Sequence, residues 1–237
     1  MCKIHKPEQI GAMQPNKQAG DILNDLIRQA NKLLQNHGFE YAFCGGWAID
    51  LFIGTETRKH GDIDILAYWQ ERDTLIEYMQ SLGFSVYEML GGGKAHHITD
   101  INYQIKSKRN IFCCTPDCEL VCLSKTDETD IYFIDFKHIG QTKLNFIEFL
   151  FNTGDNTSLF YARNHDIKLA LSDAILYSDS LPYLAPEMCL LYKSTNTERE
   201  GYQSDYDNAC LKMNQRQKRW LDEALAVMYP EGHKWRT

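Results

Sequence analysis

The spacing of apolar residues along the chain changes from a helical period to short apolar runs soon after its start. Between Gln18 and His37 apolar side chains recur every three or four residues, which predicts an amphipathic helix that ends at Gly38. The following segments predict strands at 41–44, 62–68 and 84–90, and helices at 47–52 and 70–82. Residues 1–17 are expected to be loosely ordered, and no pattern is clear between 95 and 130.

Two strongly alternating segments lie in the middle of the chain, at 131–137 and 144–150. A short link that contains Gly140 joins them, so they are predicted to be neighbouring antiparallel strands. Beyond Asn152 the strand pattern fades. Helices are predicted there near 165–177, 186–195, 203–213 and 215–229.

These elements together predict an α+β protein. We expect a mixed-sheet domain over residues 1–152 and a smaller helical domain over 153–237. A chain of 237 residues, 43% of them hydrophobic, is long enough to bury a sizeable core in such an arrangement.

The charge balance limits the partners that the protein can have. The formal net charge is −7, whereas a nucleic-acid polymer requires a basic surface, so such a polymer is not expected as a partner. No segment approaches the roughly 20 apolar residues of a membrane span, and no membrane partner is expected. The N-terminal residues are polar and carry no apolar signal core, which favours a cytoplasmic location. The sequence leaves the oligomeric state open.

Eight cysteines are expected to be free thiols in that compartment. Four of them, at 113, 114, 118 and 122, form a cluster with His96 and His97 not far upstream. Zinc binding is one interpretation, but the spacing matches no common structural zinc pattern. Small buried thiols on a strand and a loop are the simpler interpretation.

A double glycine followed by paired carboxylates carries most of the chemical information. Gly45 and Gly46 end the first apolar strand and open a helix, where backbone N–H groups can approach an anion closely. Asp62 and Asp64 are two residues apart, so on a strand they project to the same face. Hard oxygen ligands in such a pair suit Mg²⁺, which keeps other positions for substrate phosphates. The combination indicates phosphoryl-type chemistry on a nucleoside triphosphate.

A third carboxylate from another strand would complete a site for two metal ions and could take the proton of an incoming hydroxyl. Glu148 and Asp135 are both candidates, because each lies between apolar neighbours on a predicted strand. The glycines at 91–93, followed by Lys94, do not form a P-loop. The required glycine and the required Ser or Thr are replaced by Glu88 and Ala95.

The segment GGWAIDLFIGTETRKHGDIDI, residues 45–65, resembles the signature of the antibiotic nucleotidyltransferases. These include lincosamide and aminoglycoside adenylyltransferases and belong to the DNA polymerase β-like nucleotidyltransferase superfamily. Further segments resemble the strand of the third carboxylate and the C-terminal helical domain of that family. They are NFIEFLFN at 145–152, LPYLAPEMCLLYK at 181–193, Asp205-Tyr206, Trp220-Leu221 and PEGHKW at 230–235.

The resemblance implies roles for particular residues. Gly45 and Gly46 would contact the triphosphate, Asp62 and Asp64 would bind Mg²⁺, and Glu148 would be the third metal-binding carboxylate and general base. Many superfamily members have Asp at that third position, so Asp135 competes with Glu148, whose surrounding sequence fits better.

Basic residues would act on the departing phosphates. Arg58 and Lys59 would neutralise the β- and γ-phosphates, unless Arg58 forms a surface salt bridge. Lys193 would face the cleft from the helical domain, or would instead be a surface lysine whose stem packs on apolar neighbours.

The expected activity is Mg²⁺-dependent transfer of AMP from ATP to a hydroxyl of a small molecule, with release of pyrophosphate. An aminoglycoside or lincosamide antibiotic is the leading acceptor by resemblance. Acidic residues at 198, 200, 205 and 207 would suit a polycationic aminoglycoside. Two alternatives remain: adenylylation of a protein hydroxyl, and nucleotide binding without catalysis, in which residues 91–130 obstruct the cleft. The sequence does not distinguish ATP from GTP.

Overall fold

The computed structural model describes residues 25–35, 37–103, 108–137 and 139–236. The predicted loose segment 1–17 and the start of the helix predicted over 18–37 lie outside these residues. The described part of that helix is α1 (Asp25–Leu34), which buries Ile27, Ala30 and Leu34.

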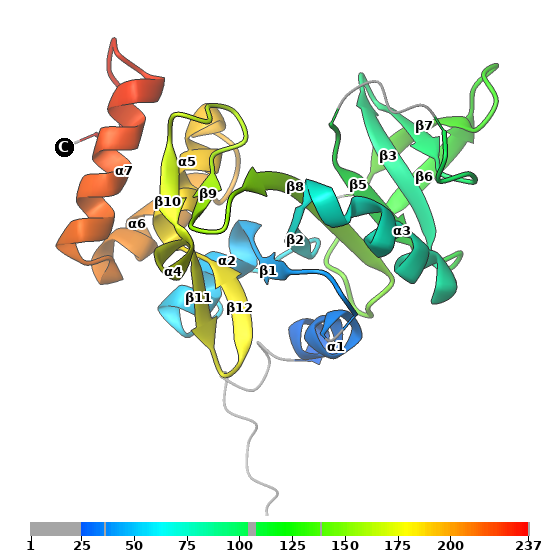
Figure 1. Cartoon of the computed structure of the whole chain (residues 1–237), viewed down its shortest axis with the longest axis horizontal. Coiled ribbons are helices and arrows are strands. Elements are labelled where there is room, and N and C mark those ends of the chain that lie inside the picture. The colour runs from blue at the N-terminus through cyan, green and yellow to red at the C-terminus, as the bar shows by residue number, and fades with distance from the viewer. Residues whose placement is uncertain (1–24, 36, 104–107, 138, 237) are drawn as a thin grey trace, which may run out of the picture.

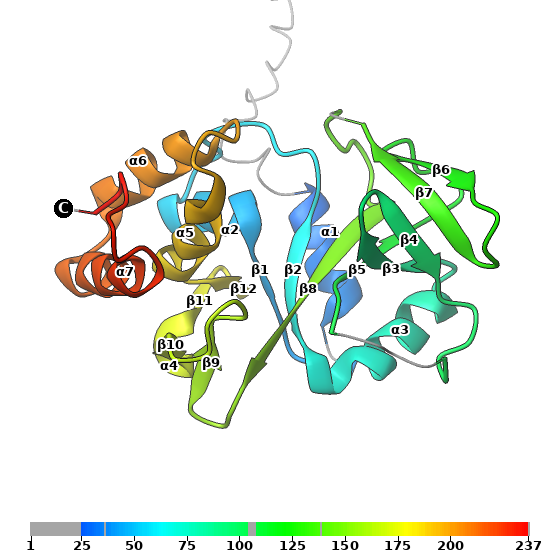
Figure 2. The same ribbon diagram turned by 90° about the horizontal axis from the view of Figure 1, so that it is seen from above.

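A long mixed sheet runs through the molecule, and among the described residues it has twelve strands (Figures 1 and 2). Two pairings in it are parallel, β1 with β12 and β2 with β8, and the others are antiparallel. Across the sheet lie β11 (Ile175–Ser178), β12 (Leu181–Leu184), β1 (Tyr41–Phe43), β2 (Asp64–Tyr68), β8 (Phe146–Gly154), β5 (Ile111–Cys114), β3 (Ser85–Gly91), β4 (Lys94–His97), β7 (Ile131–Phe136) and β6 (Val121–Lys125). A small extension continues from β8 through β9 (Ser158–Phe160) to β10 (Lys168–Ala170).

Helices pack on this sheet in two places. In Figures 1 and 2 most of them gather at the end of the sheet where β11 and β12 lie, and α3 packs beside β3 at the other end. Besides α1, the described α-helices are α2 (Gly45–Ile53), α3 (Arg72–Ser81), α4 (Leu171–Ala174), α5 (Pro186–Lys193), α6 (Tyr202–Lys212) and α7 (Gln215–Met228). The mixed sheet with packed helices confirms the predicted α+β class.

The two alternating segments at 131–137 and 144–150 are both strands, but they are not neighbours. β7 pairs with β4 and β6, whereas β8 pairs with β2, β5 and β9. Strands β5, β3 and β4 lie between them. The prediction of a hairpin was therefore wrong. Alternation shows which face of a strand is buried but does not identify its partner, and the sequence between 95 and 130 gave no strand pattern.

The helix predicted near 165–177 is also wrong. Strands β10 and β11 lie in that range, with only the single turn of α4 between them. The hairpin from β11 to β12 turns through Asp179 (φ 47°) and Ser180 (φ 69°). Two consecutive positive φ angles match the twist of a two-residue hairpin, but without Gly or Asn the sequence lacks the usual signal of that turn.

The apolar interior has two parts. The larger one lies between the sheet and the helices and contains fully buried residues such as Phe43, Ile65 and Phe149. The smaller one lies on the outer strands and is built around Tyr87, Phe112 and Phe146. Partly buried side chains of β7 pack against it. The outer part of the sheet therefore has a core of its own.

Phe149→Ala is expected to lower the free energy of unfolding by about 3–5 kcal/mol, because it leaves a cavity in the larger core. Phe149 is 0% exposed, whereas Phe133 on β7 is 50% exposed. Phe133→Ala is the matched control, with an expected cost below about 1 kcal/mol. Urea unfolding of both variants measures the difference, and equal losses would contradict this placement of the core.

Candidate active site

The double glycine lies where β1 passes into α2. Gly45 is the first residue of α2 and has φ +65°, and a side chain there would clash with the carboxylate of Asp64. The backbone N–H of Cys44 donates to the carbonyl of Asp64 (2.9 Å), and Nε1 of Trp47 donates to the carbonyl of Asp62 (2.9 Å). The start of α2 is thus held directly against the strand that carries the two aspartates.

Three carboxylates meet at this point. Asp64 is the first residue of β2, and the parallel pairing of β2 with β8 places it in register with Glu148. Asp62 precedes β2 by two residues. One oxygen from each of the three carboxylates lies within 4.8 Å of the others, and no other metal-competent group of His, Cys, Asp or Glu occurs among the described residues. Asp135 lies elsewhere, exposed on β7.

The electrostatics of this cluster favour a bound cation. Burial and then the charge of Asp62 raise the pKa of Asp64 to about 7. Burial and then the charges of Asp64 and Asp62 raise the pKa of Glu148 to about 8. A divalent cation would remove the repulsion and stabilise all three ionised carboxylates, which are the oxygen ligands that Mg²⁺ prefers. The donor set therefore fits the magnesium that the sequence predicts.

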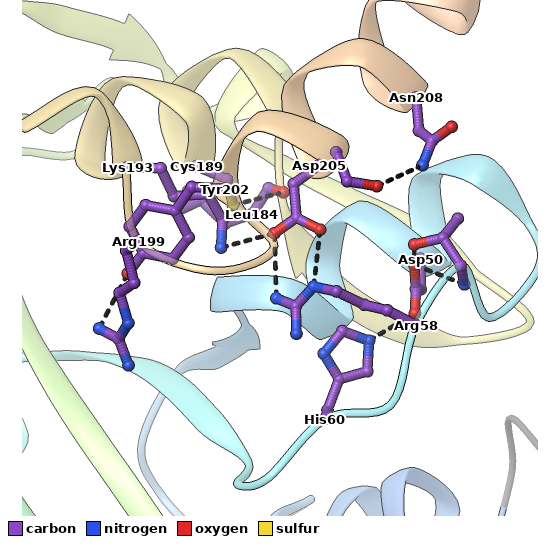
Figure 3. Close-up of polar contacts among 12 residues, drawn as sticks. Asp50, Arg58, His60, Leu184, Cys189, Lys193, Arg199, Tyr202, Asp205 and Asn208 are labelled. Carbon is purple, nitrogen blue, oxygen red and sulfur yellow. Dashed lines mark hydrogen bonds and ion pairs between the residues drawn. The ribbon is translucent and has the colours of Figure 1, made fainter. Parts of the chain in front are cut away.

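Arg58 and Lys193 come to the site from opposite sides and share one buried carboxylate (Figure 3). Arg58 donates from Nε to Oδ1 of Asp205 (2.9 Å) and from Nη2 to Oδ2 (3.0 Å). Nζ of Lys193 lies 2.9 Å from the same Oδ2. Burial alone would raise the pKa of Asp205, but the bonds from Arg58 and Lys193 outweigh it and hold that pKa below its usual range. Arg58 thus forms an ion pair, with a buried partner.

Gly201 is part of the same arrangement. It precedes α6 at φ +82°, and a Cβ there would lie 2.7 Å from Nε of Arg58. The glycine therefore lets the guanidinium approach the start of α6. Lys59 differs from these residues, since it is exposed and its side chain is not among those that line the cavity at the site.

A second buried pair fixes the loop between α2 and β2. Asp50, on α2, is 0% exposed and accepts hydrogen bonds from the backbone N–H (3.1 Å) and hydroxyl (2.6 Å) of Thr57. Nε2 of His60 lies 2.5 Å from the other carboxylate oxygen of Asp50. The pair sets the position of the loop that carries Arg58 and leads to Asp62.

Sequence reasoning missed the parts played by Asp205 and Arg199. Asp205 had no signal in the sequence, since its partner Arg58 is 147 residues away. Arg199 donates to the hydroxyl of Tyr202 (3.0 Å), and its charge lowers the pKa of Asp64 and Glu148 against the larger effect of burial.

A cavity of about 790 Å³ connects these groups. The glycine turn, the three carboxylates, Arg58 and Lys193 line it on one side. Residues of β8, the segment after β7 and the segment between β9 and β10 line the rest. The structure thus brings together seven of the eight predicted site residues around one cavity, and Lys59 is the exception.

The cysteine cluster does not form a metal site within the described part of the chain, where the acidic group at 62, 64 and 148 is the only candidate. Cys113 and Cys114 are buried on β5, and Cys122 is exposed on β6. Burial raises the pKa of the Cys113 thiol well above its usual range. Buried thiols are therefore the better interpretation for β5. None of the described helices is both long and apolar enough to cross a membrane.

Comparison with known proteins supports the resemblance found in the sequence. Residues 26–90 match the family model described as aminoglycoside-2''-adenylyltransferase. This segment contains the glycine turn, Asp62 and Asp64, and the match confirms the predicted resemblance to the antibiotic nucleotidyltransferases, which are enzymes. No curated protein matches the chain.

Several solved structures are similar to this one. A lincomycin-bound lincosamide antibiotic adenylyltransferase, LnuA, is 14% identical with a TM-score of 0.49, over 79% of this chain and 96% of that one. ANT(2'')-Ia in complex with adenylyl-2''-tobramycin is 12% identical with a TM-score of 0.49, over 85% and 98%. An antigenic nucleotidyltransferase-like protein from Paracoccidioides brasiliensis is 14% identical with a TM-score of 0.38, over 91% and 89%.

Without divalent metal, the free energy of unfolding is expected to fall as the pH rises from about 5 to about 8. Asp64 and Glu148 titrate near 7 and 8 in the folded protein but near 4 when unfolded. In that interval the folded state binds more protons, so linkage requires stability to decrease with pH. Urea unfolding with EDTA measures the decrease, and Mg²⁺ should oppose it most strongly at the upper end of the range.

Asp64→Asn should make this pH dependence shallower, because it removes one of the coupled groups. The control is Asp135→Asn, which changes an exposed aspartate outside the cluster and should leave the slope as it is. A wild-type stability that rises over the same interval, or equal slopes for Asp64→Asn and wild type, would contradict the assigned pKa shifts.

Proposed function

We propose that the chain is a divalent-metal-dependent nucleotidyltransferase that transfers AMP from ATP to a hydroxyl of a small-molecule antibiotic and releases pyrophosphate. The observation that carries this proposal is the cluster of Asp62, Asp64 and Glu148 beside a glycine turn at a helix start. The match of residues 26–90 to an aminoglycoside adenylyltransferase family supports the same chemistry.

Asp62, Asp64 and Glu148 would hold the metal, with two Mg²⁺ ions as the expected number. When bound, such ions neutralise phosphate charge and polarise the phosphoryl group. Glu148 is the proposed acceptor of the proton from the attacking hydroxyl. Its carboxylate lines the cavity in register with Asp64, so the hydroxyl of an acceptor in the cavity could reach it.

The triphosphate is proposed to lie over the start of α2. Gly45 and Gly46 have no side chain of their own to cover their backbone N–H groups, and the helix dipole favours an anion there. Arg58, Lys193 and Arg199 line the same cavity and would offset the charge of the pyrophosphate as it leaves. Lys59, predicted with Arg58, is exposed and contributes at most at longer range.

A catalytic role is favoured over nucleotide binding alone. The strands of segment 91–130 are β4, β5 and β6, and in the sheet order they lie beyond β8 from β1, the strand that leads into the glycine turn. They leave a cavity of about 790 Å³ beside the carboxylates instead of filling it. This arrangement has room for an acceptor next to Glu148.

Pyrophosphate release from ATP, Mg²⁺ and a panel of antibiotic hydroxyl acceptors tests the proposal. Asp62→Asn and Asp64→Asn should each reduce acceptor-dependent release by at least about 100-fold, a loss of about 2.7 kcal/mol of transition-state stabilisation, because metal binding would be lost. Asp135→Asn is the matched control and should keep wild-type activity, since its side chain is exposed on β7.

The outcome that would refute the transfer reaction is acceptor-dependent release that survives both substitutions. Release with a protein acceptor, and with none of the small molecules, would instead support the antitoxin-like alternative. Tight ATP binding that is unaffected by Mg²⁺ and by Asp64→Asn would support a binding protein without catalysis.

A further inference from the structure

We infer that the acceptor is an alcohol with an apolar arm and no more than one positive charge, and that the cavity discriminates against polycations. This inference rests on the proposed transfer reaction and narrows its substrate class. It is carried by the charges that line the cavity and by the apolar surface on both sides of Glu148.

Cations outnumber carboxylates on the cavity wall. Among the described residues, the carboxylates that line it are Asp62, Asp64, Glu148 and Glu200. The Lys and Arg residues that line it are Arg58, Lys108, Lys137, Arg163, Lys193 and Arg199. A polycationic ligand would therefore enter a space whose fixed charge is already positive.

Most of these carboxylates are not available to an acceptor. Three form the proposed metal site, so Glu200, which is exposed, is the one that remains in the described wall. Arg58 and Lys193 share Asp205, and the phosphates of a nucleotide would occupy the cations beside the glycine turn. Lys108, Lys137 and Arg163 belong to other parts of the wall, before β5, after β7 and between β9 and β10. They would repel the amines of a polycation.

Of the four acidic residues that the sequence offered for a polycation, all but Glu200 lie elsewhere or are already bound. Asp205 is buried between Arg58 and Lys193. Glu198 pairs with Lys234 (2.8 Å), and Asp207 accepts a hydrogen bond from Gln203 (2.8 Å). Glu198, Asp205 and Asp207 are not among the residues that line the cavity. The acidic balance of the chain is therefore not concentrated at the site.

Apolar side chains flank Glu148 instead. Phe146 and Leu150 are two residues before and after it on β8, so all three project to one face of the sheet, and all three line the cavity. Leu120 and Phe136 line it from the outer part of the molecule, and the ring of Phe136 lies 5.9 Å from that of Phe146. Phe146 is only 2% exposed, so an acceptor that brings a hydroxyl to Glu148 would lie mainly against Leu150 and Phe136, which are partly exposed.

This surface favours one kind of ligand. Covering it with an apolar arm gains hydrophobic free energy in proportion to the area buried. Placing several ammonium groups there would strip them of water without giving them carboxylate partners, which is costly. A single amine could remain in solvent or meet Glu200.

Lincomycin and tobramycin are suitable probes, because the first has a single amine and an alkyl arm whereas the second has several amines and no such arm. With ATP and Mg²⁺, kcat/KM for lincomycin is expected to exceed that for tobramycin by at least about 100-fold. An equal or higher value for tobramycin would overturn the inference while leaving the transfer reaction established.

Phe136→Ala tests the apolar wall directly. It should raise KM for lincomycin about 10-fold or more and leave KM for ATP unchanged, because Phe136 lies on the acceptor side of the cavity. Phe133→Ala is the control, since Phe133 is on the same strand, is 50% exposed and is not among the lining residues. Equal effects of the two substitutions on KM for lincomycin would argue against the wall.

A binding measurement separates this inference from the proposed function. Calorimetric titration of each probe into the full chain, with Mg²⁺ and a non-hydrolysable ATP analogue, requires no turnover. Tighter binding of lincomycin would support the inference even if no transfer occurred and the proposed function failed. Tighter binding of tobramycin, or binding of neither probe, would overturn it whatever the turnover assay showed.

Discussion

The parallel pairing of β2 with β8 is the constraint on which the rest of the site depends. It sets Asp64 beside Glu148 in register and brings both next to the start of α2. Because side chains alternate along a strand, a slip of one residue would turn Glu148 to the other face and leave Phe149 in its place. The fully buried Phe149 opposes such a slip, since it would move a large apolar side chain out of the core. Packing in the core and geometry at the site therefore enforce the same register.

The cost of this register is a concentration of negative charge. Three carboxylates lie close together, and burial and mutual repulsion raise the pKa of Asp64 and Glu148. The close carboxylates that would bind metal thus lower the stability of the metal-free fold, as is common where a fold carries a reactive site. A bound divalent ion would relieve the opposition, because it stabilises the ionised carboxylates that the fold alone holds at a cost.

Cations are arranged around the cluster in a different way. Arg58 and Lys193 are held at fixed positions by Asp205 and do not lie free on the surface. A fixed guanidinium loses little further conformational freedom when it meets a phosphate. The ion pair also links the loop before β2 to α5 and α6, so these parts of the cavity wall are joined by charge as well as by packing.

Much of this site could be predicted from the sequence, and the limits have physical causes. The glycine turn and the paired aspartates are local, so spacing alone placed Gly45, Asp62 and Asp64. The sequence around Glu148 favoured it over Asp135. That Asp135 lies exposed on β7, away from the cluster, could be learned only from the order of the strands in the sheet. Partners far apart in the chain leave no periodic signal, so the link between Arg58 and Asp205 was not predictable. The hairpin at Asp179 and Ser180 was missed because the pair lacks the glycine that usually marks a turn with two positive φ angles.

The pairing of β1 with β12 has a consequence for how the molecule forms. Phe43 is in register with Tyr183, so a strand early in the chain can pair fully only after a strand made much later is present. During synthesis the edge of β1 that faces β12 stays unpaired until the ribosome has passed residue 184. Contacts of such long sequence separation form slowly, because the loop must close before they return any free energy. The last strand to be made therefore completes the sheet beside the glycine turn, and the site is completed late in folding.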